Sequence, residues 1–177
     1  MRISKKLKSI CSEDSSKHGK KHSSVAMDYI SLLGFIGIAI SLYAIHVERK
    51  ASRNGRKKYV ALCDVNDSAS CSLVLTSEYA RLGEKYLGLS RNNLFNMPNT
   101  YYGLMFYVAV SLYPMYPFTL IPFREVLLFS ASLLSISVCC LLAWILYFRL
   151  KNFCGVCVAS WIVNVAILWQ AGSQLIY

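Results

Sequence analysis

Long uncharged apolar runs constrain the fold of this 177-residue chain more than any other feature. They cover Tyr29–Ile45, Tyr101–Ile121, Val126–Phe148 and Phe153 to about Gly172. A helix of about 20 apolar residues crosses the hydrocarbon core of a bilayer. With 55% hydrophobic and only 16% charged residues, the composition is also too apolar for an ordinary soluble domain. We therefore predict an all-α membrane protein, a bundle of four transmembrane helices.

The basic residues cluster outside these runs, although the net charge is +10. Anionic lipid headgroups account for such clusters, whereas nucleic-acid binding needs interleaved aromatics or a presenting fold that the sequence does not indicate. Residues 1–24 are rich in Lys and Ser, and we predict a disordered basic tail there. We expect residues 25–173 to form the membrane domain and residues 174–177 a short C-terminal end. In the first run, Gly34 and Gly37 predict close approach of a second helix.

Four spans place both termini on one side of the membrane and the long segment 48–99 on the other, together with the turn 149–153. Four cysteines then come to the same membrane face: Cys63, Cys71, Cys154 and Cys157. The count of basic residues on the two sides does not decide the orientation. Persistent disulfides need an oxidising compartment, so we predict a luminal cap over 48–99 and cytoplasmic termini. Apolar periodicity predicts a short helix in the cap, over residues 72–89.

The pair Cys154 and Cys157 heads the last apolar run as a Cys-x-x-Cys motif. Such a pair forms a redox disulfide, binds a metal or merely packs. At the start of a helix, free N–H groups and the helix dipole favour a thiolate, so we favour redox exchange. Cys63 and Cys71 have seven residues between them, a spacing that suits a loop disulfide better than a zinc knuckle. Between them, Asn66 begins a glycosylation sequon that is usable only in a secretory lumen.

Helical spacing places four side chains on one face of the last helix: Cys154, Cys157, Trp161 and Asn164. A buried amide such as Asn164 is costly in lipid unless it meets a partner. The face is either a simple helix contact or a pocket with a reactive thiol at its mouth. We interpret Cys139 and Cys140, inside the third run, as small apolar groups without a catalytic role.

Several motifs in order make the chain similar to the vitamin K epoxide reductase family, over about Tyr29 to Trp169. The motifs are Ser-Leu-Tyr-Ala-Ile-His-Val-Glu at 41–48, Ala-Leu-Cys-Asp-Val at 61–65, Ser-Cys-Ser at 70–72, Asn-Met-Pro-Asn at 96–99, Leu-Ala-Trp-Ile-Leu-Tyr-Phe at 142–148 and Phe-Cys-Gly-Val-Cys at 153–157. The resemblance implies a four-helix bundle in the endoplasmic reticulum membrane, with a luminal cap over a quinone pocket. It also implies reduction of vitamin K 2,3-epoxide and vitamin K quinone, without a tightly bound cofactor or a metal.

The resemblance implies a role for each of the four cysteines. Cys157 attacks the substrate, and Cys154 resolves the adduct to a disulfide. Cys71 passes electrons to Cys154, while Cys63 pairs with Cys71 and meets a luminal thioredoxin-like partner. Asn99 donates a hydrogen bond to a substrate oxygen.

Further residues line the ring and isoprenoid site in this resemblance: Tyr102, Phe106, Val74, Leu75, Leu142 and Leu146. Trp161 belongs to the same set, but it stands where the family usually has a tyrosine. An indole donates through its N–H and does not accept as a phenol does. The resemblance therefore does not carry over carbonyl recognition, or response to coumarin inhibitors, at this position.

Two alternative functions remain open at this point. A quinone-linked disulfide generator runs the same electrons in the opposite direction and oxidises a thioredoxin-like partner. A non-catalytic membrane scaffold uses its cysteines only to bind zinc or to staple loops. The residues themselves do not state the redox direction.

Overall fold

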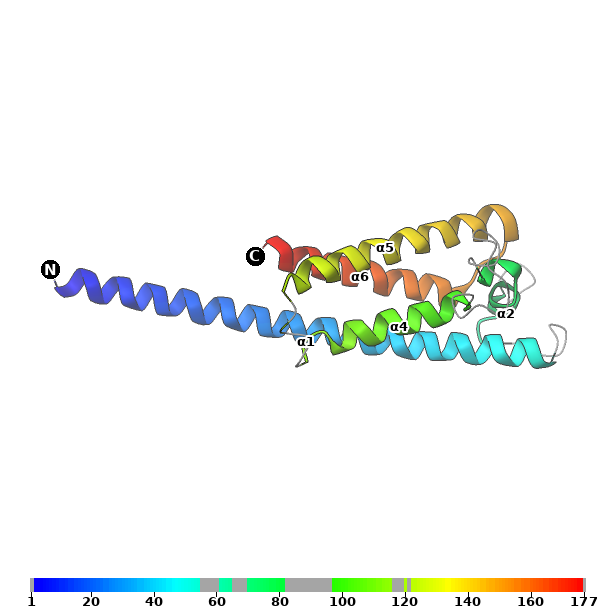
Figure 1. The fold of residues 1–177 in the computed structure, drawn as a ribbon, viewed down its shortest axis with the longest axis horizontal. Helices are drawn as coiled ribbons and strands as arrows, with labels where there is room; N and C mark the ends of the chain where they lie inside the picture. Colours follow the sequence, from blue (N-terminus) through cyan, green and yellow to red (C-terminus); the bar gives the residue numbers. More distant parts are fainter. Residues whose placement is uncertain are drawn as a thin grey trace.

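A computed structural model describes residues 2–54, 61–64, 70–81, 97–115, 120 and 122–176, leaving aside the side chains of 2–27, 78 and 176. Its main helices are α1 (Arg2–Asn54), α4 (Asn99–Leu112), α5 (Arg124–Ile145) and α6 (Gly155–Ile176). A five-residue helix α2 (Cys71–Leu75) and a short 3-10 turn η1 (Glu78–Ala80) form the described part of the cap. Figure 1 shows both termini at the end of the bundle opposite α2. The all-α class is thus confirmed, and the two termini lie at one end of the bundle, as four spans require.

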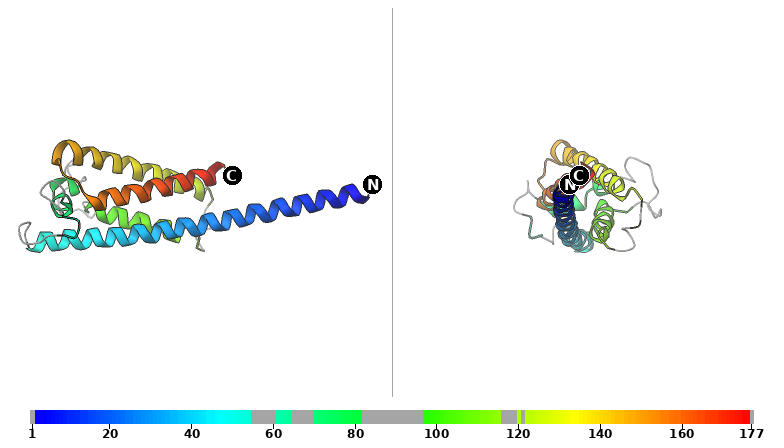
Figure 2. Two further views of the ribbon diagram at one scale, coloured as in Figure 1. Left: turned by 180° about the vertical axis from the view of Figure 1, so that it is seen from behind. Right: turned by 90° about the vertical axis from the view of Figure 1, so that its left-hand side faces the viewer.

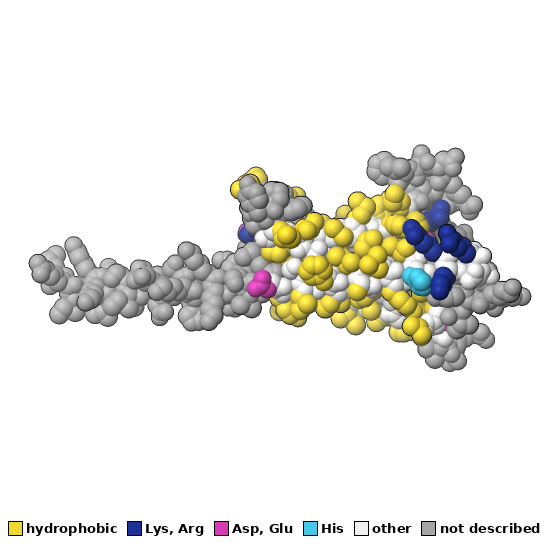
Figure 3. Space-filling view, turned by 90° about the horizontal axis from the view of Figure 1, so that it is seen from below, with side chains coloured by type: hydrophobic (Ala, Val, Ile, Leu, Met, Phe, Trp, Pro, Cys, Tyr) yellow, Lys and Arg dark blue, Asp and Glu magenta, His cyan; other side chains and the backbone are white. Residues whose placement is uncertain are grey.

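Within the described residues, three helices are long and apolar enough to cross a membrane, judged by length and composition: Asp28–Asn54, Arg124–Leu150 and Gly155–Leu175. Large apolar side chains such as Leu134 and Trp169 lie on the outside of the bundle, 68% and 80% exposed. In Figure 3 apolar side chains cover the middle of the visible face, and basic side chains gather at one end. This banding matches a bundle surrounded by lipid, with the basic end at a headgroup layer.

The second apolar run is shorter as a helix than predicted. We expected a span over Tyr101–Ile121, but α4 ends at Leu112, after 14 residues. Pro114 has no N–H to bond to the Val110 carbonyl, which instead accepts the N–H of Tyr113 at 3.3 Å. The four-helix bundle is therefore built from three helices of full length and one shorter helix.

The first helix differs from prediction at its other end. Residues 2–24, which we expected to be disordered, continue α1 as one helix beyond the bundle (Figures 1 and 2). The prediction of disorder rests on the few apolar side chains that these residues can bury. Residues 2–54 contain no proline, and Lys is a good helix former, so nothing local ends the helix that the first span begins. The sequon at Asn66 and residues 82–89 of the predicted helix 72–89 lie outside the described residues; its described part, 72–81, holds most of α2, a turn and η1.

The helices pack α1 against α4 and α6, and α5 against α6. The predicted close approach at glycines is confirmed where α1 meets α4. A Cβ atom at Gly34 would lie 2.7 Å from the backbone nitrogen of Ser111, and one at Gly37 would overlap the ring of Tyr107. Only glycine allows the two backbones this separation.

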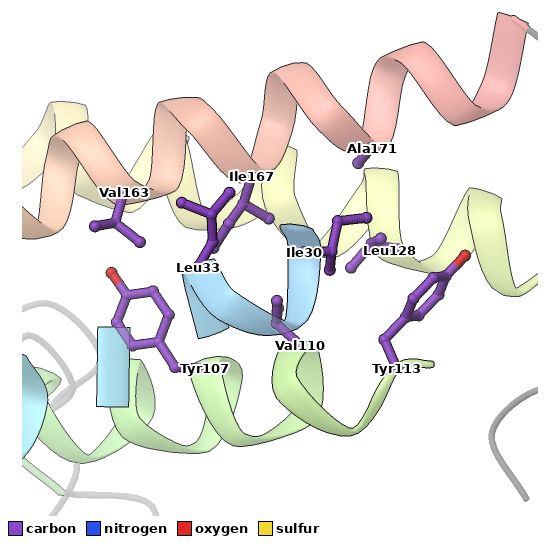
Figure 4. Close-up of a cluster of buried hydrophobic side chains, with 9 residues drawn as sticks. All are labelled: Ile30, Leu33, Tyr107, Val110, Tyr113, Leu128, Val163, Ile167 and Ala171. Carbon is purple, nitrogen blue, oxygen red and sulfur yellow. The ribbon is translucent and has the colours of Figure 1, made fainter. Parts of the chain in front are cut away.

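One buried cluster, which we call the distal core, fills the half of the bundle away from the cap (Figure 4). It draws side chains from all four main helices: Ile30, Leu33, Tyr107, Val110, Tyr113, Leu128, Val163, Ile167 and Ala171. Apart from two tyrosine hydroxyls, these side chains are hydrocarbon. The distal core therefore fixes the helices that carry the cysteines without supplying chemistry of its own.

Candidate redox site

A second buried cluster, the cap-side cluster, lies where the cap meets α1 and α6. Its buried members are Ala44, Val47, Ala61, Cys71, Leu75 and Cys154, and packed against them are Tyr43, Cys63, Val74, Leu146, Val156 and Cys157. The structure thus brings together all four cysteines that the topology placed on one face. They come from three separate parts of the chain, and only tertiary packing joins them.

Cys63 and Cys71 form a disulfide, with their Cα atoms 5.9 Å apart. We call them the outer pair. The Cys71 side chain is fully buried, whereas Cys63 is only partly buried. A Cβ atom at Gly155 would lie 3.9 Å from the Cβ of Cys63, so the outer pair rests on the first residue of α6. An incoming thiolate therefore reaches Cys63 more easily than Cys71.

The carboxylate of Asp64 holds the outer pair in place, a role that the sequence analysis did not assign. It accepts the N–H of Ala61 at 2.8 Å, and the N–H of Ser72 and the hydroxyl of Ser70 at 3.1 Å each. Partial burial opposes ionisation, but these hydrogen bonds outweigh it and lower the pKa of Asp64. The cap loop is thus fastened by an anion beside the disulfide.

Cys154 and Cys157, which we call the inner pair, are free thiols whose sulfurs lie 2.9 Å apart. Cys154 directly precedes α6, and the N–H groups of Val156 and Cys157 point to its sulfur. The hydrogen bond donated by the Cys157 thiol, together with these N–H groups, outweighs burial and lowers the pKa of Cys154. The lowered pKa favours ionisation of Cys154, which lies just before the first helical residue.

A tight turn delivers Cys154 to this place. The π-helical turn η3 (Leu146–Leu150) continues α5, and Lys151 then adopts a left-handed conformation with φ of 50°. Asn152 donates to the Leu150 carbonyl at 3.4 Å. The connection between η3 and α6 is thus only four residues long, which keeps the inner pair directly beneath the cap.

Asn164 meets its predicted need for a partner through Cys139. The Asn164 side chain is 5% exposed, and its Nδ2 donates to the Cys139 sulfur at 3.1 Å. Nearby, the Tyr107 hydroxyl donates to the Ser160 carbonyl at 3.3 Å. Our interpretation of Cys139 as a purely apolar group was too simple, because its sulfur accepts a hydrogen bond. Among the described residues, Asn164 Oδ1 has no partner.

The predicted substrate-contacting residues divide into three groups in space. Val74, Leu75 and Leu146 belong to the cap-side cluster with the cysteines. Asn99 begins α4 and donates to the Tyr79 carbonyl in the cap at 3.3 Å. The remaining residues lie outside that cluster: Phe106 packs against the distal core, Leu142 is partly buried on α5, and Tyr102 and Trp161 are 45% and 46% exposed.

Three possible metal donors lie within 4.8 Å of one another: Cys63, Asp64 and Cys71. Both sulfurs are joined in the disulfide, so they offer no thiolates for zinc in this state. The arrangement of two sulfur pairs in one cluster is suited to thiol–disulfide exchange.

Comparison with known proteins agrees with this arrangement. Residues 29–171 match the vitamin K epoxide reductase family. The vitamin K epoxide reductase complex subunit 1 of Rattus norvegicus is 38% identical over 135 residues, which cover 75% of this chain and 80% of the relative. The same subunit of Mus musculus matches with the same identity and coverage. The predicted resemblance is confirmed, and the chain belongs to the vitamin K epoxide reductase family.

Proposed function

We propose that this protein is a membrane thiol–disulfide oxidoreductase that reduces vitamin K 2,3-epoxide and vitamin K quinone. The observation that carries the proposal is the packing of Cys71 against the same buried cluster as Cys154, both 0% exposed. Two buried sulfurs in one cluster exchange electrons with each other rather than with water. The substrate is supported by the family and by the names of the rat and mouse relatives.

In the first stage, two electrons pass from the thioredoxin-like partner through the outer pair to the inner pair. A thioredoxin-like dithiol attacks Cys63, the less buried sulfur, and Cys71 leaves as a thiolate. The second thiol of the partner then displaces Cys63, so the partner becomes a disulfide and the outer pair a dithiol. Cys71 next attacks Cys154 in the oxidised inner pair, and Cys63 resolves the mixed disulfide, which restores the outer disulfide and leaves the inner pair reduced.

The second stage passes the electrons to the substrate. Cys157, the less buried thiol of the inner pair, attacks the substrate and gives its proton to the substrate oxygen, while Cys154, 2.9 Å away, stays a thiolate. Cys154 then attacks the Cys157 sulfur and closes the inner disulfide. Two electrons and two protons convert the quinone to the hydroquinone, or the epoxide to the quinone and water. One amide hydrogen of Asn99 holds the cap at Tyr79, and the other donates to the substrate oxygen as its charge develops.

The disulfide in the cap supports a location in the endoplasmic reticulum membrane with both cysteine pairs luminal. A disulfide in the cap persists in an oxidising compartment and not against a cytosolic thiol pool. The termini lie at the opposite end of the bundle, so they face the cytoplasm (Figure 1). A lipid-soluble quinone reaches the bundle from the bilayer, while the reducing partner approaches from the lumen.

The test is vitamin K epoxide reduction in membranes, comparing the wild type with Cys157→Ser and Cys63→Ser. We expect Cys157→Ser to abolish reduction with any reductant. Cys63→Ser should lose the activity driven by a thioredoxin-like protein and retain activity with a membrane-permeant dithiol. Epoxide reduction by Cys157→Ser at the wild-type rate, or a wild type that oxidises thioredoxin with quinone and never consumes epoxide, would refute the proposal. The second result would identify a disulfide generator.

A further inference from the structure

The two sulfurs of the outer pair have different surroundings. The Tyr43 hydroxyl, on α1, lies 3.8 Å from the Cys63 sulfur, within the range of a hydrogen bond to sulfur. The Cys71 sulfur instead lies 3.8 Å from the backbone carbonyl oxygen of Cys63. One sulfur thus has a hydroxyl donor beside it and the other has an acceptor. A negative charge is therefore better accommodated on Cys63.

The negative charge of the Asp64 carboxylate makes the Tyr43 hydroxyl donor important for Cys63. Its oxygen and the sulfurs of Cys63 and Cys71 all lie within 4.8 Å of one another. Hydrogen bonds from the cap keep this carboxylate ionised, and an anion at such a distance disfavours a thiolate on either cysteine. A thiolate on Cys63 consequently needs a compensating donor.

An apolar groove strengthens the effect of that donor. The groove has a volume of about 350 Å³ between α1 and α6, and it is lined by Ala39, Ile40, Tyr43, Cys63, Gly155, Val156 and Ala159. Water competes poorly for a hydroxyl in such surroundings, and a hydrogen bond to a charged sulfur is stronger there than in solution.

We propose that Tyr43 is a catalytic residue of the outer pair, whose hydroxyl stabilises the Cys63 thiolate each time that sulfur is released from a disulfide. The inference rests on the proposed function, which supplies the exchange step in which Tyr43 acts. In that step the second thiolate of the partner attacks the partner sulfur bonded to Cys63. The partner disulfide forms, the bond to Cys63 breaks, and its electron pair goes to the Cys63 sulfur. The Tyr43 O–H donates to that sulfur until water protonates it.

The experiment measures the Cys63 thiol directly. In the full chain carrying Cys71→Ser, alkylation of Cys63 by a maleimide is followed from pH 6 to pH 10 by mass spectrometry of the Cys63 peptide. We expect Tyr43→Phe to move the profile to higher pH and to slow alkylation about tenfold at neutral pH, because a hydrogen bond to a charged group is lost. The charged or titratable groups that face Cys63 from the packed elements, Asp64, Cys154 and Cys157, are unchanged in both proteins.

Tyr147→Phe is the matched control, since Tyr147 lies 75% exposed on η3, away from the groove lining. Tyr43→Phe keeps the ring and its packing, so both variants should keep the thermal midpoint of the wild type. A second readout is the rate at which the mixed disulfide between thioredoxin and Cys63 is resolved in the protein with native cysteines, expected to fall about tenfold with Tyr43→Phe alone. An identical pH profile for Tyr43→Phe and Tyr147→Phe would overturn the inference.

The outcome separates this inference from the proposed function. Neither readout requires reduction of a quinone or an epoxide. A shifted Cys63 profile in a protein that reduces neither substrate would overturn the proposed function alone. An unshifted profile in a protein that reduces both would overturn the role of Tyr43 alone.

Discussion

The distal core and the cap-side cluster are both buried, but they consist of different types of side chain. The distal core joins four helices through aliphatic and aromatic side chains, and α1 and α4 meet there at Gly34 and Gly37. The cap-side cluster joins short irregular segments to the ends of α1 and α6 through sulfur atoms and small residues. Its polar anchor is Asp64, with three hydrogen bonds to two segments of the cap, the turn at Ala61 and the start of α2.

Stability and chemistry therefore depend on different parts of the bundle: stability on the distal core, and thiol exchange on the cap-side cluster. Close packing tolerates little change in volume, so the distal core is where substitutions should alter the free energy of unfolding. Thiol exchange needs sulfurs that change partners, so the cap-side cluster is held by hydrogen bonds that surround the sulfurs and leave them able to move. Substitutions in the two regions should therefore separate activity from stability.

The largest effect is expected at the inner pair. Cys154→Ser removes both the resolving thiol and the acceptor of electrons from Cys71, so steady-state epoxide reduction should fall more than about 10³-fold, equivalent to about 4 kcal/mol. Serine has nearly the size of cysteine, so the thermal midpoint should change little. Turnover assays in membranes and thermal unfolding in detergent measure the two quantities. Residual turnover within tenfold of wild type would show that Cys154 is not on the electron path.

At the distal core we expect the opposite result, a loss of stability without a change in the reactivity of the cysteines. In Gly34→Ala the new Cβ meets the Ser111 backbone at 2.7 Å, so α4 has to shift, and stability should fall by about 1–3 kcal/mol. The folded protein should keep its alkylation pattern at Cys63. Gly103→Ala is the control, because its Cβ would lie 3.7 Å from the Ser41 hydroxyl, an ordinary contact. Equal thermal midpoints for the two variants would contradict the close packing of α1 on α4.

The sequence predicted the parts of this comparison that follow from periodicity and connectivity. Uncharged runs predicted the long helices, and four passes through the bundle predicted that the cysteines share one end. The two glycines of the first run predicted the close approach of a second helix, and the structure identifies that helix as α4. Each of these follows from local composition, which the single chain already contains.

The sequence did not predict what depends on contacts between distant segments. Asp64 looks like an ordinary loop residue until Ala61 and Ser72 are seen to converge on it. Tyr43 belongs to an apolar run, and nothing in its spacing connects it with Cys63. The end of α4 at Leu112 depends on the missing N–H of Pro114, and here hydropathy and backbone chemistry disagree.

A smaller effect is expected when the polar anchor of the cap loses its charge. In Asp64→Asn an amide N–H replaces one acceptor, and the cap should lose about 1 kcal/mol, since the carboxylate is only partly buried and solvent screens it. The stabilising effect of Asp64 is present above the ordinary pKa of about 3.9 and is lost as pH falls through its lowered value. Midpoints measured from pH 7 to pH 2.5 should therefore differ between wild type and variant at neutral pH and converge in acid. A constant difference over this range would show that the charge does not hold the loop.

The smallest effect is expected at Asn164, which lies between the two regions. Its Nδ2 bonds to Cys139, whereas its Oδ1 is buried without a partner among the described residues. Asn164→Leu gives up one weak hydrogen bond to sulfur and removes one unsatisfied oxygen, so the two changes should nearly cancel, within about 1 kcal/mol. Combining it with Cys139→Ala in a double-mutant cycle should give a coupling energy below about 0.5 kcal/mol.

If Asn164→Leu lowered the free energy of unfolding by about 3 kcal/mol or more, the amide would contribute to stability as the distal core does. Such a loss would mean that both its oxygen and its nitrogen are hydrogen-bonded in the membrane. The expected near-neutral result has the opposite meaning. An amide that an apolar side chain can replace at no cost to the fold is not retained for stability. Epoxide turnover of the same variant would then test whether Asn164, on the same helix face as Cys157, takes part in the thiol chemistry of the cap-side cluster.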